Sequence, residues 1–337
     1  MEKLITFAIP CYNSAEYMHK CIESLLDAGD DTEIIIINDG SKDNTGEIAD
    51  KYAAEFPDKV RVIHQENGGH GEGVNQGLRH ARGEFYKVVD SDDRLNPEAL
   101  GALLSKMREH TYAGTEIDMY VCNYVYDHWD GSPQKVMRYA NVFPENKISK
   151  WDDTKRFLVT QYLMMHSVVY RTELLRECGI MLPKHTFYVD NLYMYQPFPY
   201  VKNIYYMDLN LYMYFIGRAD QSVTETNVIK RIDQQLRVTK LMLDSHNLND
   251  IKKQSKRLYG YMMHEMALMV CISLIFLYKS KDEENYKKAD QLWKYIKDKD
   301  VETYRKLKYC SLCLISLLGK RVSVFVYSIV RKIFRFN

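Results

Sequence analysis

The sequence predicts an α/β fold, in which a doubly wound, mostly parallel sheet has helices on both faces and is followed by a helical C-terminal region. Two observations support this prediction. Short apolar runs typical of strands alternate with amphipathic helical segments over residues 4–100, and strand–helix–strand units at this spacing pair in parallel through right-handed crossovers. From residue 227 onward the apolar residues recur at helical spacing. We therefore expect one domain over residues 1–226 and a helical region over residues 227–337.

The first strands follow from apolar runs. Residues 4–10 form a short apolar run that ends at a proline, and residues 33–39 are an unbroken β-branched run, which is typical of a strand covered on both faces. Two further strands are expected over residues 60–65 and 84–90. The amphipathic segments within residues 14–25, 40–56 and 73–81 are the expected helices between these strands.

Polar residues and glycines follow each of these four strands. They are Tyr12 and Asn13, then residues 38–41, then residues 67–71, and finally Asp90, Asp92 and Asp93. One such group has an ordinary explanation, because Asn, Asp and Gly are turn residues. Four groups at the carboxyl edge of one sheet instead predict a ligand site, because doubly wound folds bind ligands there.

The strand–helix alternation changes after Pro97. A helix is expected over residues 97–110, a strand over 118–129 and a helix near 190–196. Residues 261–278 are almost long enough to span a bilayer, but His264 and Glu265 within them would be costly there. We therefore expect this helix to be buried or to face another subunit of a homo-oligomer.

The C-terminal segment over residues 309–337 is apolar, then basic and aromatic. Lys320 and Arg321 interrupt its apolar run, so it is a poor membrane-spanning helix. Basic and aromatic residues beside apolar ones suit a helix that lies on anionic lipid, which would make the protein peripheral on the membrane. A helix packed on the protein with a solvated basic face fits the same residues, and both interpretations remain open.

Composition excludes some classes of protein. Hydrophobic residues make up 46% of the 337 residues and charged residues 27%, as in globular proteins. The net charge of +1 gives no reason to expect nucleic acid as a partner. Seven irregularly spaced cysteines indicate a reducing compartment, and the first residues lead into a strand without the features of a signal peptide. We therefore expect a cytoplasmic protein.

The end of the fourth strand suits a metal ion. Side chains alternate along a strand, so Asp90 and Asp92 point to the same side. Mg²⁺ and Mn²⁺ bind one or two protein carboxylates together with substrate phosphates, and they neutralise charge on a leaving diphosphate. An exposed turn with solvated charges that caps the next helix explains the same three aspartates. Their spacing alone leaves both interpretations open.

Three ordered segments, residues 5–26, 33–53 and 67–93, resemble glycosyltransferase family 2. The resemblance is strong over residues 4–100, continues more loosely to about residue 224 and then fades. It implies the GT-A fold, a Rossmann-like form of the sheet predicted above. It also implies an inverting, metal-dependent enzyme that moves a sugar from a nucleotide-diphosphate donor, a UDP-sugar, to a hydroxyl of a glycan or lipid-linked acceptor. Its setting would be the synthesis of surface or cell-envelope glycans at the inner face of the membrane.

The resemblance also implies a role for individual residues. Asp92 matches the ligand of Mg²⁺ or Mn²⁺, Asp90 the ribose-side carboxylate and Asp39 the acceptor that faces uracil. The remaining donor-binding candidates are Pro10, Tyr12, Asn13, Gly68, Gly69, Asn75 and Asp93. The chain departs from the common family pattern at Val74, where arginine is frequent, and at Asn38, where an aspartate is usual.

A transferase needs a base, because an acceptor hydroxyl is a poor nucleophile until its proton is removed. Residues 185–195 resemble the acidic motif of the family, and Val189 replaces its first acid, which leaves Asp190 as the candidate base. Asp190 would also suit the N-cap of the following helix; we favour the base. Residues 214–224 resemble a segment that closes over the donor diphosphate, through Arg218, Gln221 and Ser222, although a surface loop fits them equally. His166 lies in an apolar stretch, and we expect it to be a core residue with satisfied ring nitrogens.

Two other functions fit the sequence less well. A sugar nucleotidyltransferase would carry a glycine-rich, basic phosphate loop after its first strand, and residues 10–18 have no glycine and no basic residue. A nucleotide-sugar-binding protein without turnover would be expected to have lost acidic residues, but Asp90, Asp92 and Asp190 are all present. The glycosyltransferase interpretation is therefore preferred.

Overall fold

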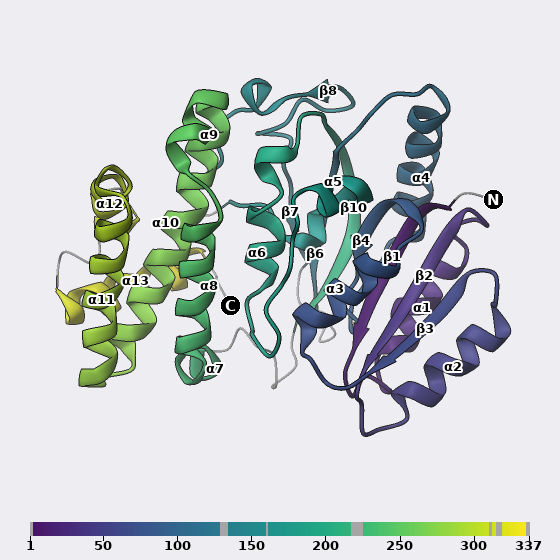
Figure 1. Cartoon of the computed structure of the whole chain (residues 1–337), viewed down its shortest axis with the longest axis horizontal. Coiled ribbons are helices and arrows are strands. Elements are labelled where there is room, and N and C mark those ends of the chain that lie inside the picture. Colours follow the sequence, from purple (N-terminus) through teal and green to yellow (C-terminus); the bar gives the residue numbers. More distant parts are fainter. Residues whose placement is uncertain are drawn as a thin grey trace. The chain divides into compact units, whose positions relative to one another are not determined.

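The computed structural model describes residues 3–128, 134–159, 161–216, 225–309, 312–314 and 319–334. The chain divides into two compact units (Figure 1). The sheet unit comprises residues 1–156 and 163–217, and the helical unit comprises residues 157–162 and 218–337. The short segment 157–162 therefore belongs to the helical unit although it lies within the sheet unit in sequence.

The sheet unit is built on one sheet with the strand order β3-β2-β1-β4-β9-β6-β10-β5, in which β7 also pairs with β6 and β8 with β10. The strands are β1 (Lys3–Cys11), β2 (Thr32–Asp39), β3 (Val60–Gln65), β4 (Gly83–Val88), β5 (Arg94–Leu95), β6 (Met119–His128), β7 (Lys135–Met137), β8 (Ile148–Ser149), β9 (Val168–Arg171) and β10 (Ile204–Ile216).

Strands β1 to β4 form the parallel half of the sheet, as the sequence predicted. β1 pairs in parallel with both β2 and β4, and β3 pairs in parallel with β2. The β-branched run of β2 is fully buried over residues 34–37, which are 0% exposed, because helices cover both faces of a parallel sheet.

The other half of the sheet is mixed. β9 is antiparallel to both β4 and β6, and β6 is parallel to β10. The expected strand over residues 118–129 is therefore β6, which is parallel to β10 and antiparallel to both β9 and β7.

The helices and 3-10 turns of the sheet unit are α1 (Met18–Leu26), α2 (Thr45–Glu55), α3 (His70–His80), α4 (Pro97–Tyr112), η1 (Trp151–Asp153), η2 (Met165–Ser167), α5 (Thr172–Glu177), α6 (Asp190–Tyr195) and η3 (Phe198–Tyr200). Two neighbouring residues of β4 show that helices cover both faces. Tyr86 donates a hydrogen bond to Val74 O of α3 (2.9 Å). Phe85 contacts Tyr120, whose hydroxyl pairs with His110 Nδ1 of α4 (2.8 Å). Because successive side chains of a strand point to opposite faces, α3 and α4 lie on opposite sides of the sheet.

The helical unit consists of α7 (Glu225–Lys230), α8 (Ile232–Ser245), α9 (Leu248–Gln254), α10 (Lys256–Lys279), α11 (Glu283–Lys299), α12 (Val301–Lys308) and α13 (Lys320–Phe334). By length and composition α10 could cross a membrane, but 72% of its most apolar window is buried. Its polar residues have partners inside the unit: His264 Nε2 lies 3.1 Å from Gln161 O, and Glu265 accepts from Tyr261. The expectation of a buried helix is confirmed.

Candidate active site

The register of the parallel strands brings the predicted site residues to one edge of the sheet. Cys11 lies opposite Asn38, Asp39 lies opposite Gln65, and Ala8 lies opposite Val88. The turns that follow β1 to β4 therefore leave the sheet side by side, as the sequence predicted from their polar residues.

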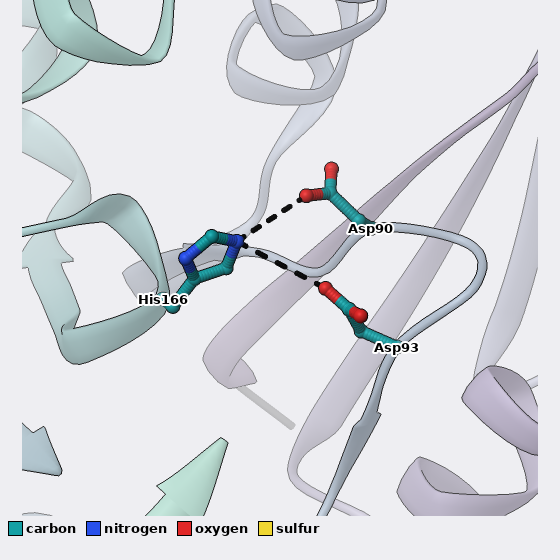
Figure 2. A group of neighbouring side chains, drawn as sticks. All are labelled: Asp90, Asp93 and His166. Carbon is teal, nitrogen blue, oxygen red and sulfur yellow. Dashed lines mark ion pairs between the residues drawn. The ribbon is translucent and has the colours of Figure 1, made fainter. Parts of the chain in front are cut away.

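Asp90, Asp93 and His166 converge at this edge (Figure 2). His166 Nε2 lies 3.5 Å from Asp90 Oδ2 and 3.9 Å from Asp93 Oδ2. One ligand atom from each residue lies within 4.8 Å of the other two. On the other side of Asp90, His70 Nε2 donates to Oδ1 (2.9 Å). The Asp90 carboxylate is thus placed between two imidazoles.

These neighbours affect the pKa values of both Asp90 and His70. Burial opposes ionisation of Asp90, but its contacts with His166 and His70 outweigh burial and lower its pKa. Burial disfavours the charged form of His70, yet the hydrogen bond and charge of Asp90, with the charges of Asp190 and Asp92, raise the pKa of His70. The site thus favours a carboxylate at position 90.

Asp93 has a structural partner on each oxygen. Oδ2 accepts from Tyr212 Oη (2.7 Å) and Oδ1 accepts from the Phe215 backbone N–H (2.7 Å). The same Tyr212 hydroxyl accepts from the Asp90 backbone N–H (3.0 Å). Burial, together with the charges of Asp92 and Asp90, raises the pKa of Asp93. Asp93 therefore joins the turn after β4 to strand β10 as well as facing His166.

His166 is buried, as expected, but its ring nitrogens are not satisfied. Within the part of the chain that the structure describes, neither nitrogen has a hydrogen-bond partner, and the 3.5 Å to Asp90 exceeds a normal hydrogen bond. The expectation of a satisfied core histidine is therefore wrong. The apolar residues next to His166 in sequence belong to η2 and β9. The imidazole ring of His166 itself faces the carboxylates of Asp90 and Asp93.

Lys87 holds the turn that carries His166. Its side chain is 0% exposed, and Nζ donates to His166 O (2.9 Å) and Val168 O (3.1 Å). The ammonium also lies 4.9 Å from the centroid of the Tyr212 ring. Burial lowers the pKa of Lys87 to about 7. Lys87 thus links β4 to η2 and β9, next to the carboxylates of the cluster.

The cluster fits a divalent cation. Two carboxylates and an imidazole are a ligand set that Mn²⁺ accepts readily, whereas Mg²⁺ prefers oxygen ligands. Asp92, the residue predicted as metal ligand, is not among the three described residues whose ligand atoms converge. It lines a neighbouring pocket of about 240 Å³ with Lys20, Arg94 and other residues. Its role at a metal stays a prediction.

Asp39, the residue predicted to face the nucleobase, joins the end of β2 to the turn after β3. Oδ1 accepts from Gly68 N (2.7 Å) and Gln65 Nε2 (2.6 Å), and Oδ2 accepts from Gly69 N (2.8 Å). A carboxylate has about four acceptor positions, so one remains for a ligand donor. Gln65 Oε1 beside it is buried with no partner among the described residues. Gln65 is thus a further candidate that sequence reasoning missed.

The turn after β1 is tied to the turn after β2. Asn13, with φ 51°, accepts from Lys42 N through Oδ1 (2.8 Å), and its backbone N–H donates to Ser41 Oγ (3.1 Å). Tyr12 is 50% exposed beside it. Pro10 is buried, and a Cβ on Gly73 of α3 would approach Pro10 Cβ to 2.9 Å. Tyr12 therefore remains available to a ligand, whereas Pro10 packs against α3.

The side chain of Asn75 makes its hydrogen bonds within the protein. Its amide donates to Leu182 O (2.9 Å), and its Oδ1 accepts from Leu182 N (2.9 Å). Nδ2 also donates to Glu72 Oε2 (3.1 Å). Asn75 thus clamps α3 to the segment that leads to Asp190, and direct contact with a nucleotide stays a prediction.

Asp190 is the first residue of α6, and the N-cap position belongs to Val189, without a capping hydrogen bond from its side chain. The alternative that Asp190 is merely an N-cap is therefore not supported. Burial raises the pKa of Asp190. The charges of His70 and His166 lower this pKa and partly offset the effect of burial, whereas the charge of Asp90 raises it further. These interactions place Asp190 near the carboxylate cluster. The backbone before it is strained, because Tyr188 has φ 66°.

Three further candidates cannot be placed. Arg218, Gln221 and Ser222 lie outside the described residues, so their contact with a donor diphosphate stays a prediction.

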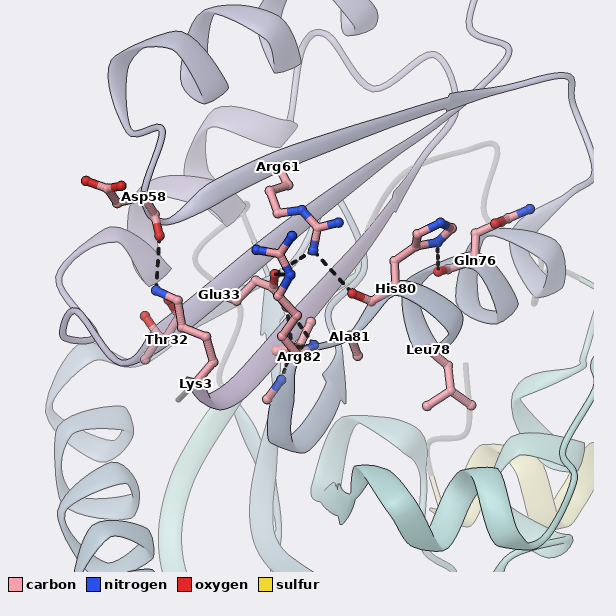
Figure 3. A network of polar contacts seen from close by, with 12 residues as sticks. Lys3, Thr32, Glu33, Asp58, Arg61, Gln76, Leu78, His80, Ala81 and Arg82 are labelled. Atoms are coloured by element: carbon pink, nitrogen blue, oxygen red, sulfur yellow. Dashed lines mark hydrogen bonds and ion pairs between the residues drawn. The ribbon is translucent and has the colours of Figure 1, made fainter. Parts of the chain in front are cut away.

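A buried carboxylate at the opposite end of the sheet, that of Glu33, has a structural role (Figure 3). Glu33, at the start of β2, is 1% exposed and accepts from Thr6 Oγ1 (2.7 Å), Arg61 Nη1 (2.7 Å) and Arg82 N (3.0 Å). Every contact of this carboxylate joins neighbouring segments of the sheet unit. Glu33 therefore provides a purely structural comparison for the acidic residues of the site.

Comparisons with known proteins identify the family of this chain. A sequence model described as "Glycosyl transferase family 2" matches residues 6–178, which is 173 of the 337 residues. The protein named "Putative glycosyltransferase EpsH" from Bacillus subtilis (strain 168) is 40% identical over 121 residues, which is 36% of this chain and 33% of that protein. The chain thus matches about a third of the length of this relative.

Solved structures show the same fold. A crystal structure of S. aureus TarS in complex with UDP-GlcNAc has a TM-score of 0.59 at 20% identity and covers 90% of each chain. The mannosyltransferase PcManGT from Pyrobaculum calidifontis, in complex with GDP-Man and Mn²⁺, has a TM-score of 0.54 at 13% identity, over 92% of this chain and 88% of that one.

Proposed function

The chain belongs to glycosyl transferase family 2, and from that premise we propose that it transfers a sugar from a UDP-sugar to a hydroxyl of a glycan or lipid-linked acceptor, with inversion at the anomeric carbon and with Mn²⁺ or Mg²⁺ bound. The observation that supports this most is the convergence of Asp90, Asp93 and His166 at the carboxyl edge of the parallel strands. Asp190 lies close enough to this cluster to share its electrostatics. The setting we propose is surface or cell-envelope glycan synthesis on the cytoplasmic side of the membrane.

The nature of the donor rests on the resemblance and on the structural neighbours. TarS was crystallised with UDP-GlcNAc, and PcManGT with GDP-Man and Mn²⁺. Both are under 25% identical to this chain, so they support the fold and a nucleotide-sugar donor as a class. The remaining acceptor position on Asp39, and Gln65 Oε1, which has no partner among the described residues, suit a ring N–H such as that of uracil. Uracil and guanine both carry a ring N–H that fits these acceptors, so the choice of UDP rests on the family resemblance.

In the proposed mechanism the acceptor hydroxyl attacks the anomeric carbon of the donor from the side opposite the diphosphate. A bond forms between the acceptor oxygen and this carbon, and the bond from the carbon to the phosphate oxygen breaks, so that its electron pair leaves with UDP. Asp190 takes the proton of the acceptor hydroxyl. A bound divalent cation would neutralise the charge of the leaving diphosphate.

The protein residues have distinct tasks in this scheme. The pKa of Asp190 is raised by burial, which makes it a stronger base than an exposed carboxylate. His70 holds the Asp90 carboxylate through a hydrogen bond, His166 faces it at 3.5 Å, and Lys87 holds the η2 turn that carries His166. The site is therefore organised before substrate arrives, as electrostatic catalysis requires.

Replacing Asp190 by asparagine tests the proposal. With a panel of nucleotide sugars and glycan acceptors, Asp190→Asn should lower the turnover number by about 100-fold or more, while binding of UDP, measured by calorimetry with and without Mn²⁺, should stay unchanged. Full transfer activity in Asp190→Asn would exclude Asp190 as the base. If the unaltered protein binds UDP but turns over no sugar of the panel, the second candidate, a nucleotide-sugar-binding protein without turnover, would be favoured.

A further inference from the structure

Helix α13 is apolar on two faces. One face packs within the helical unit: Ser323 is 0% exposed, and the Tyr327 ring lies 6.0 Å from the Phe276 ring of α10, centroid to centroid. Lys279 Nζ lies 5.7 Å from the Tyr327 centroid on the same side. This contact accounts for Tyr327 and leaves the exposed apolar residues of α13 to be explained.

The other face of α13 carries an apolar stripe. Val322, Phe325 and Ile329 are 46%, 65% and 42% exposed. Their spacing of three and four residues places them on one side of the helix over two turns. Single exposed apolar residues are ordinary on a protein surface, but an aligned stripe of large side chains indicates a surface that contacts another apolar phase.

The end of the sequence carries charge of one sign. Lys320 and Arg321 begin α13 and are exposed. The sequence after residue 302 has no aspartate or glutamate, and its basic residues are Arg305, Lys306, Lys308, Lys320, Arg321, Arg331, Lys332 and Arg335. The whole chain has a net charge of only +1, so the positive charge is concentrated in this segment.

We propose that α13 binds the surface of an anionic lipid bilayer, with Val322, Phe325 and Ile329 inserted at the level of the headgroups and with Lys320 and Arg321 at the start of the helix facing the lipid phosphates. An apolar stripe flanked by basic residues is the pattern of interfacial helices, and each basic residue near an anionic surface adds to the attraction. A second copy of this chain fits the stripe less well, because two such faces would bring like charges together. The proposal does not depend on the proposed transfer reaction.

Co-sedimentation of the full chain with vesicles tests this surface. The protein should bind vesicles of phosphatidylcholine and phosphatidylglycerol and should bind pure phosphatidylcholine vesicles much more weakly. Phe325→Glu should lower the partition coefficient about tenfold or more, and Arg321→Glu about fivefold or more on anionic vesicles. The matched control is Tyr112→Glu, since Tyr112 of α4 is 96% exposed; it makes the same kind of change elsewhere and should leave binding unchanged.

Three results would overturn the proposal: no binding to anionic vesicles, equal losses in Phe325→Glu and Tyr112→Glu, or a dimer in solution that Phe325→Glu dissociates while vesicle binding persists. The last result would assign the stripe to self-association. Circular dichroism confirms that each variant is folded, and UDP binding in the same samples separates a failure of this surface from a failure of the sugar-donor site.

Discussion

Replacing Lys87 by methionine should change how the stability of the protein depends on pH. Lys87 is fully buried, and its ammonium makes hydrogen bonds to His166 O and Val168 O. Methionine has a similar length and no charge, so the substitution removes the titrating group with little change in packing.

The magnitude follows from the pKa of Lys87. Burial lowers it to about 7 from the ordinary 10.5, while Cys122, Asp90 and Asp93 act in the opposite direction. Between these pH values the unfolded chain binds a proton that the folded chain does not, so stability increases as pH rises. The full difference corresponds to about 4.8 kcal/mol at about 1.36 kcal/mol per pH unit. Between pH 7 and pH 9 the expected gain is about 2 kcal/mol, and it is an upper limit because both carbonyl hydrogen bonds favour the ammonium.

Urea unfolding at pH 7, 8 and 9 in the presence of EDTA measures this effect. We expect the difference in free energy of unfolding between the unaltered protein and Lys87→Met to rise by about 2 kcal/mol from pH 7 to pH 9. Other titrating groups cancel in this difference. Lys51→Met, a change at an exposed lysine of α2, should give no such rise. Parallel pH dependences for the protein and Lys87→Met would refute the argument.

Three further predictions concern the site and the fold. Because the pKa of Asp190 is raised and the base must be ionised, transfer should be lost as pH falls through a value above the ordinary carboxyl range, which a pH profile of kcat/KM measures. His166→Phe should weaken Mn²⁺ binding about tenfold or more in calorimetry, because it removes a cluster nitrogen. Glu33→Ala should lower the free energy of unfolding by about 3 kcal/mol in urea while leaving kcat unchanged, because its carboxylate contacts only structural partners.

Each of these predictions has a contradicting outcome. A rate that stays constant down to pH 4 would exclude a raised pKa for the base. Unchanged Mn²⁺ affinity in His166→Phe would shift the metal site to Asp92, where the family resemblance puts it. A loss of kcat without a loss of stability in Glu33→Ala would show that the amino end of the sheet is coupled to the site.

The sequence alone determined the parallel half of the sheet and the edge at which the site lies. Strands β1 to β4 follow one another closely in sequence, so local apolar patterns predict both their position and their pairing. Asp39 and Asp90 were predicted at the site for the same reason. Each follows a predicted parallel strand, so its position at the carboxyl edge of the sheet can be read from the local sequence.

The tertiary structure decided which residues complete the site. His166 and Tyr212 come from η2 and β10, which reach the end of β4 only through pairing across long sequence separations, and β10 has a bulge between Tyr206 and Tyr212 that sets which side chains face the carboxylates. A shift of one residue in a strand reverses the face of every side chain, and no local pattern reports such a shift. The same holds for hydrogen bonds across the fold: the amide of Asn75 is occupied by Leu182, 107 residues away, which the residue type at position 75 could not show.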